Sequence, residues 1–562
     1  MTVSTASRLS AIPVRRARWD RRLWGSVVVV AIGWSFAQAG ADLTAIVNRR
    51  GWSQVTSFFS AMFHPDLSWS MLTLTVREAG VTLGYALVGT ALALVIGTIG
   101  GVLLTERIWQ PVHGSMRWGW IGWMMGRLAF AVPRSMHEVV FGLILVNILG
   151  LDPLVAVLAI GIPFGAVTAK VFAELIDNVP TAAEVELRAL GAGRLTALIV
   201  ATMPQAFNDL LSYAFYRFEC SLRSAAVLGI VGAGGLGFQL ALSFQSLRYN
   251  EMWTLLWALI ILSGITDRWS SAVRRRRNAA AVEMRVDIDG AGQDADLAPR
   301  DDRFVRLSAL ACAVSIPIAI WGLRLNPATL WSGRARRLAR ELVVNAWPPR
   351  VGLGGFSDLL RDSFDTVALA VLATALAWAF STPVAFLARR RISSARSGPA
   401  VGRLVVSSFV RFVLLICRSV PPPVWAFVVV FVLFPGLWPG AVALAIYNFG
   451  VLGRLQSEVV ENTDPTSANI LAATGATRPG ALLVATVPAV ASRFAGLGLY
   501  RWEVAIRETV IVGVVGAAGL GRRLDEQTSS FDYDGILATI LALLAVTVMV
   551  DLASAAIRRT LR

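Results

Sequence analysis

The sequence predicts an all-α polytopic membrane protein of about twelve transmembrane helices, arranged as two tandem, parallel six-helix repeats. Three observations support this prediction. Of the 562 residues, 56% are hydrophobic and only 16% are charged, which is too little charge to cover the surface of a soluble chain of this length. Many apolar runs approach the roughly 20 residues that a helix needs to cross a bilayer. The third observation is an internal repeat at a constant offset of 284 residues.

Helices are the spanning elements that this sequence favours, because its apolar runs lack the alternating pattern of barrel strands. In a bilayer the backbone must satisfy its own hydrogen bonds, which a helix does within one segment. The spans predicted in the first half are 23–40, 79–104, 117–150 with a break near Pro133, 152–173, 196–217 and 250–266. Those predicted in the second half are 307–323, 364–388, 404–435, 437–457, 480–501 and 535–557.

The repeat maps the first half onto the second when 284 is added to each residue number, so that Tyr216-Arg217 becomes Tyr500-Arg501. Because six spans per half is an even number, both halves have the same orientation and form a parallel repeat. We therefore predict a first repeat over 1–266 with its core at 76–266, and a second repeat over 307–562 with its core at 361–557. The polar segment 267–306 between them is predicted to be a cytoplasmic linker.

The net charge of +16 is explained by membrane topology, because the arginines cluster in short loops between apolar runs. Such clusters stay on the cytoplasmic side, so we expect both termini to be cytoplasmic and no nucleic-acid partner. The apolar run 23–36 between Arg21-Arg22 and Ala37-Gln38-Ala39 resembles a cleavable signal peptide. A retained helix is favoured, because the matching run 307–323 has no cleavage-like site after it.

Two polar loops at matching positions, Glu174–Arg194 and Glu458–Arg478, interrupt the apolar pattern. Each holds a proline turn, a short helix of small residues, a Gly-Ala stop suited to a left-handed helix end and an arginine. A helix of this composition outside the membrane needs a surface to cover it, either its own protein or a partner. The candidate contact residues are Glu184, Glu186, Ala189, Gly191, Ala192 and Arg194 in the first loop, and Ala472, Gly475, Ala476 and Arg478 in the second.

Ionisable residues at membrane depth usually face a bundle interior or an aqueous path. Such residues recur in both halves, as Arg217, Glu219 and Arg223, and as Arg501, Glu503 and Arg507. Each glutamate precedes an arginine by four residues, the favourable order on a helix. Four arginines against two glutamates predict a positive cavity suited to a dianionic oxyanion through forked hydrogen bonds. The alternative is that each glutamate neutralises an arginine and the set locks two helices together.

Other residues of the same segments carry weaker signals. Arg127, Arg134 and Arg418 are expected nearer the cytoplasmic half, where snorkelling or structural roles are more common than ligand binding. Six glycines, Gly232, Gly235, Gly237, Gly516, Gly519 and Gly521, would permit tight turns on the outer side. Close helix packing is the other explanation for membrane glycines.

Two longer motifs carry a resemblance to a known family. The segments YRFECSLRSAAVLGIVGAGGLG (216–237) and YRWEVAIRETVIVGVVGAAGLG (500–521) resemble phosphonate-importer permeases. The stretches at Arg134-Ser135 and Arg418-Ser419-Val420-Pro421 resemble the Arg-Ser-Ile-Pro stretch of that family. The two polar loops resemble the coupling loop of ATP-binding-cassette (ABC) importer permeases. They depart from it at Val185 and Asn469, where that family usually has glutamate.

The resemblance implies a type I ABC importer permease fold in the bacterial plasma membrane. It implies that two copies of an ABC ATPase dock at the two loops and that an extracytoplasmic solute-binding protein delivers the anionic substrate. The outer glycines would form a periplasmic gate region. Membrane lipid is the remaining partner of a chain with this composition.

No chemistry of its own is predicted for the chain. It lacks the G-x-x-x-x-G-K-[ST] loop of nucleotide-binding proteins, and its only lysine, Lys170, follows no glycine-rich loop. We therefore expect no enzyme activity, no metal site and no cofactor, with ATP and Mg²⁺ on the partner ATPase. The predicted function is phosphonate import by alternating access. The alternatives are a phosphate or phosphite importer of the same architecture, an ion-coupled secondary anion transporter and, least favoured, a membrane enzyme.

Overall fold

The computed structural model describes residues 14–40, 47–109, 117–289, 303–351, 355–389 and 400–561. In these ranges all regular secondary structure is helical, apart from an isolated antiparallel bridge between Val47 and Leu433. The all-α prediction is confirmed for this part of the chain.

The helices follow one another in nearly the same order in both halves, except that α5 and η3 have no counterpart among the described residues of the second half. The first half contains α1 (Val14–Gln38), η1 (Arg49–Gly51), α3 (Trp52–Ala61), α4 (Trp69–Leu104), α5 (Glu106–Trp109), α6 (Arg117–Ser135), α7 (Glu138–Leu149), α8 (Leu154–Asp177), α9 (Ala182–Ala189), α10 (Arg194–Ala197), η2 (Leu198–Thr202), α11 (Met203–Leu228), η3 (Gly229–Ala233), α12 (Gly235–Gln245) and α13 (Tyr249–Asp289). The second half contains α14 (Arg303–Gly322), η4 (Pro327–Trp331), α15 (Gly333–Asn345), α16 (Gly355–Ala388), α17 (Ala400–Ser419), α18 (Pro422–Val432), α19 (Leu437–Glu461), α20 (Thr466–Ala473), α21 (Arg478–Ala481), η5 (Leu482–Thr486), α22 (Val487–Gly513), α23 (Leu520–Ser529) and α24 (Tyr533–Leu561).

The repeat predicted from the sequence recurs in the helix boundaries. α9 and α20, and the π-helical turns η2 and η5, have the same bounds once the offset of 284 is added. α13 and α24 likewise begin one offset apart, at Tyr249 and Tyr533.

Six helices among the described residues are long and apolar enough to cross a bilayer alone: Trp69–Leu104, Leu154–Asp177, Arg303–Gly322, Gly355–Ala388, Pro479–Gly513 and Tyr533–Arg558. Three bent pairs pass the same test only together. Their bends are 84° between α6 and α7, 55° between the segment 194–233 and α12, and 94° between α17 and α18. The first bend follows Ser135, close to the break predicted near Pro133. The described residues thus hold six to nine candidate spans, and the count of twelve stays a prediction.

Small residues allow the central helices of each half to pack closely. On α4, a Cβ added to Gly89 would lie 2.8 Å from Ile160, and one added to Gly97 would lie 2.4 Å from Thr168. In the second half, α16 buries a series of alanines against α19, among them Ala370, Ala373 and Ala377. Such contacts are typical of helix packing in membranes, where close van der Waals contact replaces the hydrophobic effect.

The first helix of each half packs on the other half. Trp34 of α1 makes an edge contact with Phe364 of α16, and the Gln38 side chain donates a 2.8 Å hydrogen bond to Asp365. Conversely, α14 packs on α4, where a Cβ added to Gly84 would lie 3.1 Å from Leu323. The two repeats are consecutive along the chain, but their first helices are exchanged in space.

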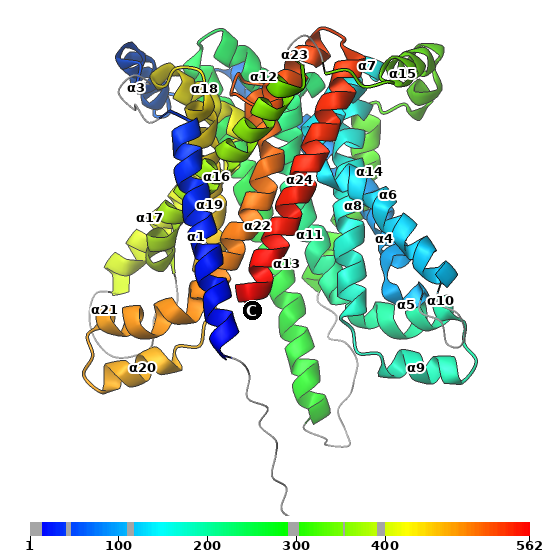
Figure 1. Cartoon of the computed structure of the whole chain (residues 1–562), viewed down its shortest axis with the longest axis vertical. Coiled ribbons are helices and arrows are strands. Elements are labelled where there is room, and N and C mark those ends of the chain that lie inside the picture. Colours follow the sequence, from blue (N-terminus) through cyan, green and yellow to red (C-terminus); the bar gives the residue numbers. More distant parts are fainter. Residues whose placement is uncertain are drawn as a thin grey trace, which may run out of the picture.

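Two ends of the molecule differ in what they carry (Figure 1). The loop-helix end holds α9 and α20, together with the start of α1 and the end of α24, so both described termini lie there. The opposite end, the glycine-turn end, holds α12, α23 and the short helices α3 and α15. α15 exposes the basic residues Arg334, Arg336, Arg337 and Arg340, so the glycine-turn end carries an exposed arginine cluster.

The predicted linker is partly helical. α13 continues through Asp289, so the first part of the segment 267–306 extends the preceding helix. α14 starts at Arg303, and residues 290–302 lie outside the described residues. Asp267, the first residue of the predicted linker, lies within α13 and faces the second half, as described below.

Candidate functional site

A cavity of about 610 Å³ lies between the halves, with walls from α8 and α11 on one side and α19 and α22 on the other. It runs from the bends at Met136 and Pro421 to Leu175 and Asp209, near the loop-helix end. Its charged lining residues are seven arginines and five carboxylates: Arg134, Arg217, Arg223, Arg418, Arg454, Arg501, Arg507, Glu138, Asp209, Glu219, Glu458 and Glu508. The excess of arginines makes the cavity electropositive in formal charge.

Five of the six ionisable residues predicted for the path line this cavity: Arg217, Glu219, Arg223, Arg501 and Arg507. The sixth, Glu503, is not among the lining residues. It accepts a hydrogen bond from Arg558 of α24 instead. The expected pair four residues apart therefore forms in the first half, where Arg223 Nη2 lies 3.0 Å from Glu219 Oε1, but Glu503 and Arg507 do not repeat it.

Arg501 has a partner that the sequence analysis missed. Its Nη2 atom lies 3.0 and 2.8 Å from the two carboxylate oxygens of Glu508, and it also bonds the Asn448 side chain. Arg501 is 6% exposed and Glu508 is also buried. A separation of seven residues places both side chains on one helix face, which is the signal that would have predicted this pair.

The first half places its carboxylate differently. The position equivalent to Glu508 is Ser224, whose hydroxyl donates a 2.5 Å hydrogen bond to Glu138 of α7. The position equivalent to Glu138 is Pro422, which cannot supply a carboxylate. Glu138 and Glu508 are thus both buried beside the cavity, but they come from different helices in the two halves.

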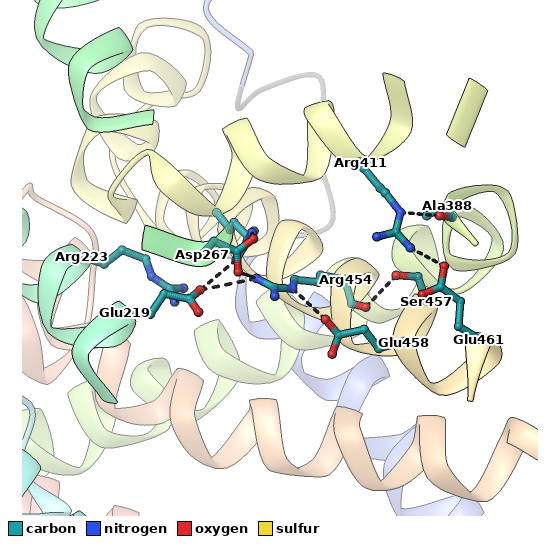
Figure 2. A network of polar contacts seen from close by, with 10 residues as sticks. Glu219, Arg223, Asp267, Ala388, Arg411, Arg454, Ser457, Glu458 and Glu461 are labelled. Atoms are coloured by element: carbon teal, nitrogen blue, oxygen red, sulfur yellow. Dashed lines mark hydrogen bonds and ion pairs between the residues drawn. The ribbon is translucent and has the colours of Figure 1, made fainter. Parts of the chain in front are cut away.

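A network of ion pairs joins the halves on one side of the cavity (Figure 2). Glu219 of α11 lies 3.1 Å from Arg418 and 3.5 Å from Arg454 of the second half. Asp267 of α13 lies 3.0 Å from Arg418 and also pairs with Arg454, which binds Glu458 at 2.9 Å. We call these five residues the cross-half network. Figure 2 shows Glu219 and Asp267 pointing together at Arg454.

The equivalent residues on the other side make no such network. Glu219, Asp267, Arg418, Arg454 and Glu458 correspond to Glu503, Asp551, Arg134, Lys170 and Glu174. Lys170 pairs with Glu174 at 3.6 Å within α8, and Glu503 pairs with Arg558 within the second half. Among the described residues, none of these five makes an ion pair that joins the halves.

The three arginines expected to snorkel or to serve the structure have different positions. Arg127 is exposed and lies 4.1 Å above the Trp123 ring, which suits snorkelling. Arg418 is buried in the cross-half network, and both Arg134 and Arg418 line the cavity. The cavity wall is therefore more basic than the predicted path residues alone indicate.

The predicted loop helices form and project at one end of the molecule. Gly191 follows the end of α9 and Gly475 follows the end of α20, both with φ of +93°, the left-handed geometry expected of these glycines. Exposed residues of the two loops include Glu186, Ala189, Ala472, Gly475 and Ala476. Glu184 differs, because it is buried and bonds Arg107 at 2.7 Å. Ala192 is half-buried, Arg194 donates to the Ile108 carbonyl, and the Arg478 side chain lies outside the described residues.

Asp464 precedes α20 and accepts hydrogen bonds from the hydroxyl and the backbone N–H of Thr466. These bonds hold the pKa of Asp464 below its ordinary value. The carboxylate is therefore charged at neutral pH, at the start of the exposed helix.

The predicted outer glycines adopt tight turns in both halves. Gly232, Gly235, Gly516 and Gly519 have positive φ values, which favour glycine. Gly237 serves close packing instead, because an added Cβ would lie 1.8 Å from the Ala226 carbonyl oxygen. Gly521 is similar, with Val510 Cα 2.7 Å from an added Cβ. Both explanations offered for these glycines therefore apply, each to different positions.

No group of three or more His, Cys, Asp or Glu side chains among the described residues is arranged to hold a metal ion. The polar lining of the cavity consists mainly of arginines, carboxylates and tyrosines. Such a set can bind an anion through ion pairs and hydrogen bonds.

Comparison with known proteins gives matches over most of the chain. The family described as "Binding-protein-dependent transport system inner membrane component" matches residues 119–276 and 392–562. The phosphate-import permease protein PhnE of Mycolicibacterium smegmatis is 28% identical over 487 residues, which are 85% of this chain and 84% of that protein.

Shorter relatives match part of the chain. The phosphite transport system permease protein PtxC of Stutzerimonas stutzeri is 31% identical over 43% of this chain and 84% of its own length. The putative cryptic phosphonate transport system permease protein PhnE2 of Escherichia coli is 31% identical over 21% of this chain and 97% of its own length. A chain of the MetNI methionine ABC transporter in an inward-facing conformation aligns with 22% identity, covering 38% of this chain and 99% of that one, at a TM-score of 0.32.

Proposed function

The chain belongs to the binding-protein-dependent transport system inner membrane component family, which it matches twice, and we propose that it is the permease of an ATP-driven importer for a phosphorus oxyanion. Membership makes it a multi-pass inner membrane protein and a transport subunit without catalytic activity or a cofactor of its own. Because the domain occurs twice in one chain, a single polypeptide supplies both halves of the permease.

The observation that carries the proposal is the electropositive cavity between the two halves. Seven arginines line it, and it extends toward the loop-helix end. At the glycine-turn end, side chains of both halves, among them Leu240, Trp253, Val424 and Leu437, pack in one apolar cluster. A central cavity that extends toward one end and meets apolar packing at the other is the arrangement expected of one state of an alternating-access transporter.

The loop helices suit the proposed docking of two ATPase subunits. Val185 of α9, Leu190 just after it and Ile470 of α20 are exposed, with exposed fractions of 60%, 84% and 59%. Apolar side chains on a helix that projects beyond the bundle favour a covering partner. We propose one ATPase copy at each loop helix, which would place the loop-helix end and both termini in the cytoplasm.

Twelve spans in a type I importer fold complete the proposed architecture. The glycine turns at Gly232 and Gly516 would then lie at the periplasmic face, where a solute-binding protein delivers the anion. The exchange of first helices between the halves supports a single, jointly assembled unit.

The identity of the oxyanion is the finer part of the proposal. The motifs favour phosphonate, whereas the relative that matches 85% of the chain is named for phosphate import and a shorter one for phosphite. The three anions share a tetrahedral shape and negative charge, and arginines bind them through the same forked hydrogen bonds. We propose a phosphorus oxyanion of this class, with phosphonate and phosphate as the two substrates to separate first.

The test is uptake by cells that carry the chain with its ATPase and binding protein. Labelled phosphate and labelled methylphosphonate are supplied separately, each with unlabelled phosphate, phosphite and methylphosphonate as competitors. Import of either label supports the proposal, and the competitor that acts at the lowest concentration identifies the preferred anion. If neither label enters, and labelled phosphite does not enter either, while the chain and its ATPase are present in the membrane fraction and the binding protein is expressed, the proposed substrate class is wrong.

A further inference from the structure

Arg217 is a buried cation without a counter-ion. It is 8% exposed and lines the cavity. Among the described residues it has no ion pair within 4.0 Å, and its Nε atom has no hydrogen-bond partner. Its guanidinium instead lies 4.2 Å above the Phe164 ring and 5.7 Å from the Tyr213 ring. A charge held at this depth without a partner is costly unless it serves a ligand or an aqueous path.

The equivalent residue of the second half has the opposite environment. Arg501 is bound by both oxygens of Glu508 and by Asn448. At the equivalent positions of the first half stand Ser224 and Phe164, neither of which offers a negative charge. The two arginines are thus equally buried and face the same cavity, but only Arg501 is neutralised.

The other arginines of the cavity wall are engaged or more exposed. Arg223 pairs with Glu219, and Arg418 and Arg454 belong to the cross-half network. Arg507 donates a 3.0 Å hydrogen bond to the Arg134 carbonyl. Arg507 and Arg134 are both only partly buried. Arg217 therefore combines deep burial with a free guanidinium.

We propose that Arg217 is the residue that binds the transported oxyanion in the cavity, and that Arg501 is structural, so the path has one anion site rather than two equivalent ones. This inference rests on the proposed function and narrows it to one residue of one half. It separates two arginines that the sequence repeat makes equivalent.

The chemistry suits a tetrahedral oxyanion. A guanidinium presents N–H donors as a planar fork that matches two oxygens of a phosphate or phosphonate group. The Phe164 ring, 4.2 Å from the guanidinium, packs against this group and leaves its N–H donors for a ligand. Tyr213 and Tyr216 line the same cavity with their rings 5.8 Å apart, and their hydroxyls can donate to the remaining oxygens.

The experiment compares uptake of labelled phosphate, or of labelled methylphosphonate if only that label is imported, by the complete transporter. The variants are Arg217→Gln, Arg217→Lys and the double variant R501Q/E508Q, which removes the second-half pair as a neutral unit. Uptake is measured at saturating binding protein and divided by the amount of chain in the membrane. We expect R217Q to lose at least tenfold in maximal rate, R217K to keep part of it, and R501Q/E508Q to stay within about threefold of wild type.

Other outcomes overturn the inference. If R217Q transports like wild type, Arg217 does not bind the anion. If R501Q/E508Q loses as much as R217Q at equal abundance, the site is not one-sided. A wild-type chain that imports none of labelled phosphate, methylphosphonate and phosphite would instead remove the proposed function, and this inference with it, so the two failures are distinguishable. Detergent-solubilised R217Q should also elute as the wild-type chain does in size-exclusion chromatography, and an aggregated variant would indicate a structural role.

Discussion

The surroundings of Glu219 and of Glu503 occupy equivalent places in the two halves but are built differently. Around Glu219, Arg223, Arg418 and Arg454 converge on one buried carboxylate, which is 7% exposed. Glu503 instead pairs with Arg558 within its own half. The equivalent of Arg454 is Lys170, which together with Glu174 is about half exposed, at 48% and 54%. Among the described residues, ion pairs of these groups therefore join the two halves on one side of the cavity and not on the other.

This difference shows that two repeats joined in one chain can change their residues independently. In a symmetric dimer of identical subunits, a residue change appears on both sides of the axis. In a single chain, each half can change separately, so one can hold Glu508 where the other holds Ser224, and Arg454 where the other holds Lys170. The residues that the two repeats share give both halves the same fold. The charged residues that differ between equivalent positions give the two sides of the cavity different ion pairs.

The largest effect is expected from the cross-half network. Arg418→Met leaves Glu219 and Asp267 buried with fewer counter-ions, and removal of one partner of a buried ion pair typically costs about 3–5 kcal/mol. We expect a loss of about 3 kcal/mol, since Arg454 still contacts both carboxylates. The matched control is Arg134→Met, which removes the equivalent arginine where no described carboxylate lies within 4.0 Å, and should cost less than about 1 kcal/mol. Thermal unfolding in detergent compares the two variants, and equal losses would contradict the one-sided network.

An intermediate effect is expected at the loop helices. Glu184 ties α9 to Arg107 through a buried 2.7 Å ion pair, whereas the equivalent position in α20 is Ala468. Glu184→Ala should therefore raise the hydrogen–deuterium exchange rate of the α9 amides by about tenfold or more, because loss of the ion pair with Arg107 lowers the free energy of local opening. In the wild-type chain, α20 should already exchange faster than α9. Equal exchange of the two helices in the wild-type chain would show that Glu184 does not hold α9 in place.

The smallest effect is expected at a glycine turn. Gly516 has a φ of +94°, and a Cβ added there would meet no heavy atom within 4 Å. Gly516→Ala should thus cost only the strain of a left-handed residue, about 1 kcal/mol. Gly237→Ala should cost more, because its Cβ would lie 1.8 Å from the Ala226 carbonyl oxygen. Thermal unfolding midpoints of the two variants give the comparison, and a larger drop for G516A than for G237A would contradict it.

The sequence could predict features that depend on local pattern. The offset of 284 located both loop helices and both glycine turns, because each is determined by a few neighbouring residues. The arginine-rich wall was likewise foreseeable, since ionisable residues on apolar helices face the bundle interior.

Features that depend on the choice of neighbour could not be predicted. Hydrophobic periodicity shows which face of a helix is buried but not what covers it, so the exchange of α1 and α14 between the halves was missed. For the same reason Glu503 was paired with Arg507, four residues away, although the folded chain gives it Arg558. Asp267 was assigned to a polar linker, because nothing in its local sequence indicates that Arg418 and Arg454 of the other half lie beside it.

The most direct test of the central claim is uptake by proteoliposomes that contain the chain with its ATPase and binding protein. Labelled phosphate and labelled methylphosphonate are each supplied with ATP, with a non-hydrolysable ATP analogue, and with ATP plus ionophores that dissipate proton and sodium gradients. The account predicts that one of these anions accumulates only when ATP is hydrolysed and that the ionophores have no effect. Uptake that proceeds without the ATPase and stops when the gradients collapse would contradict it and identify the chain as an ion-coupled secondary transporter.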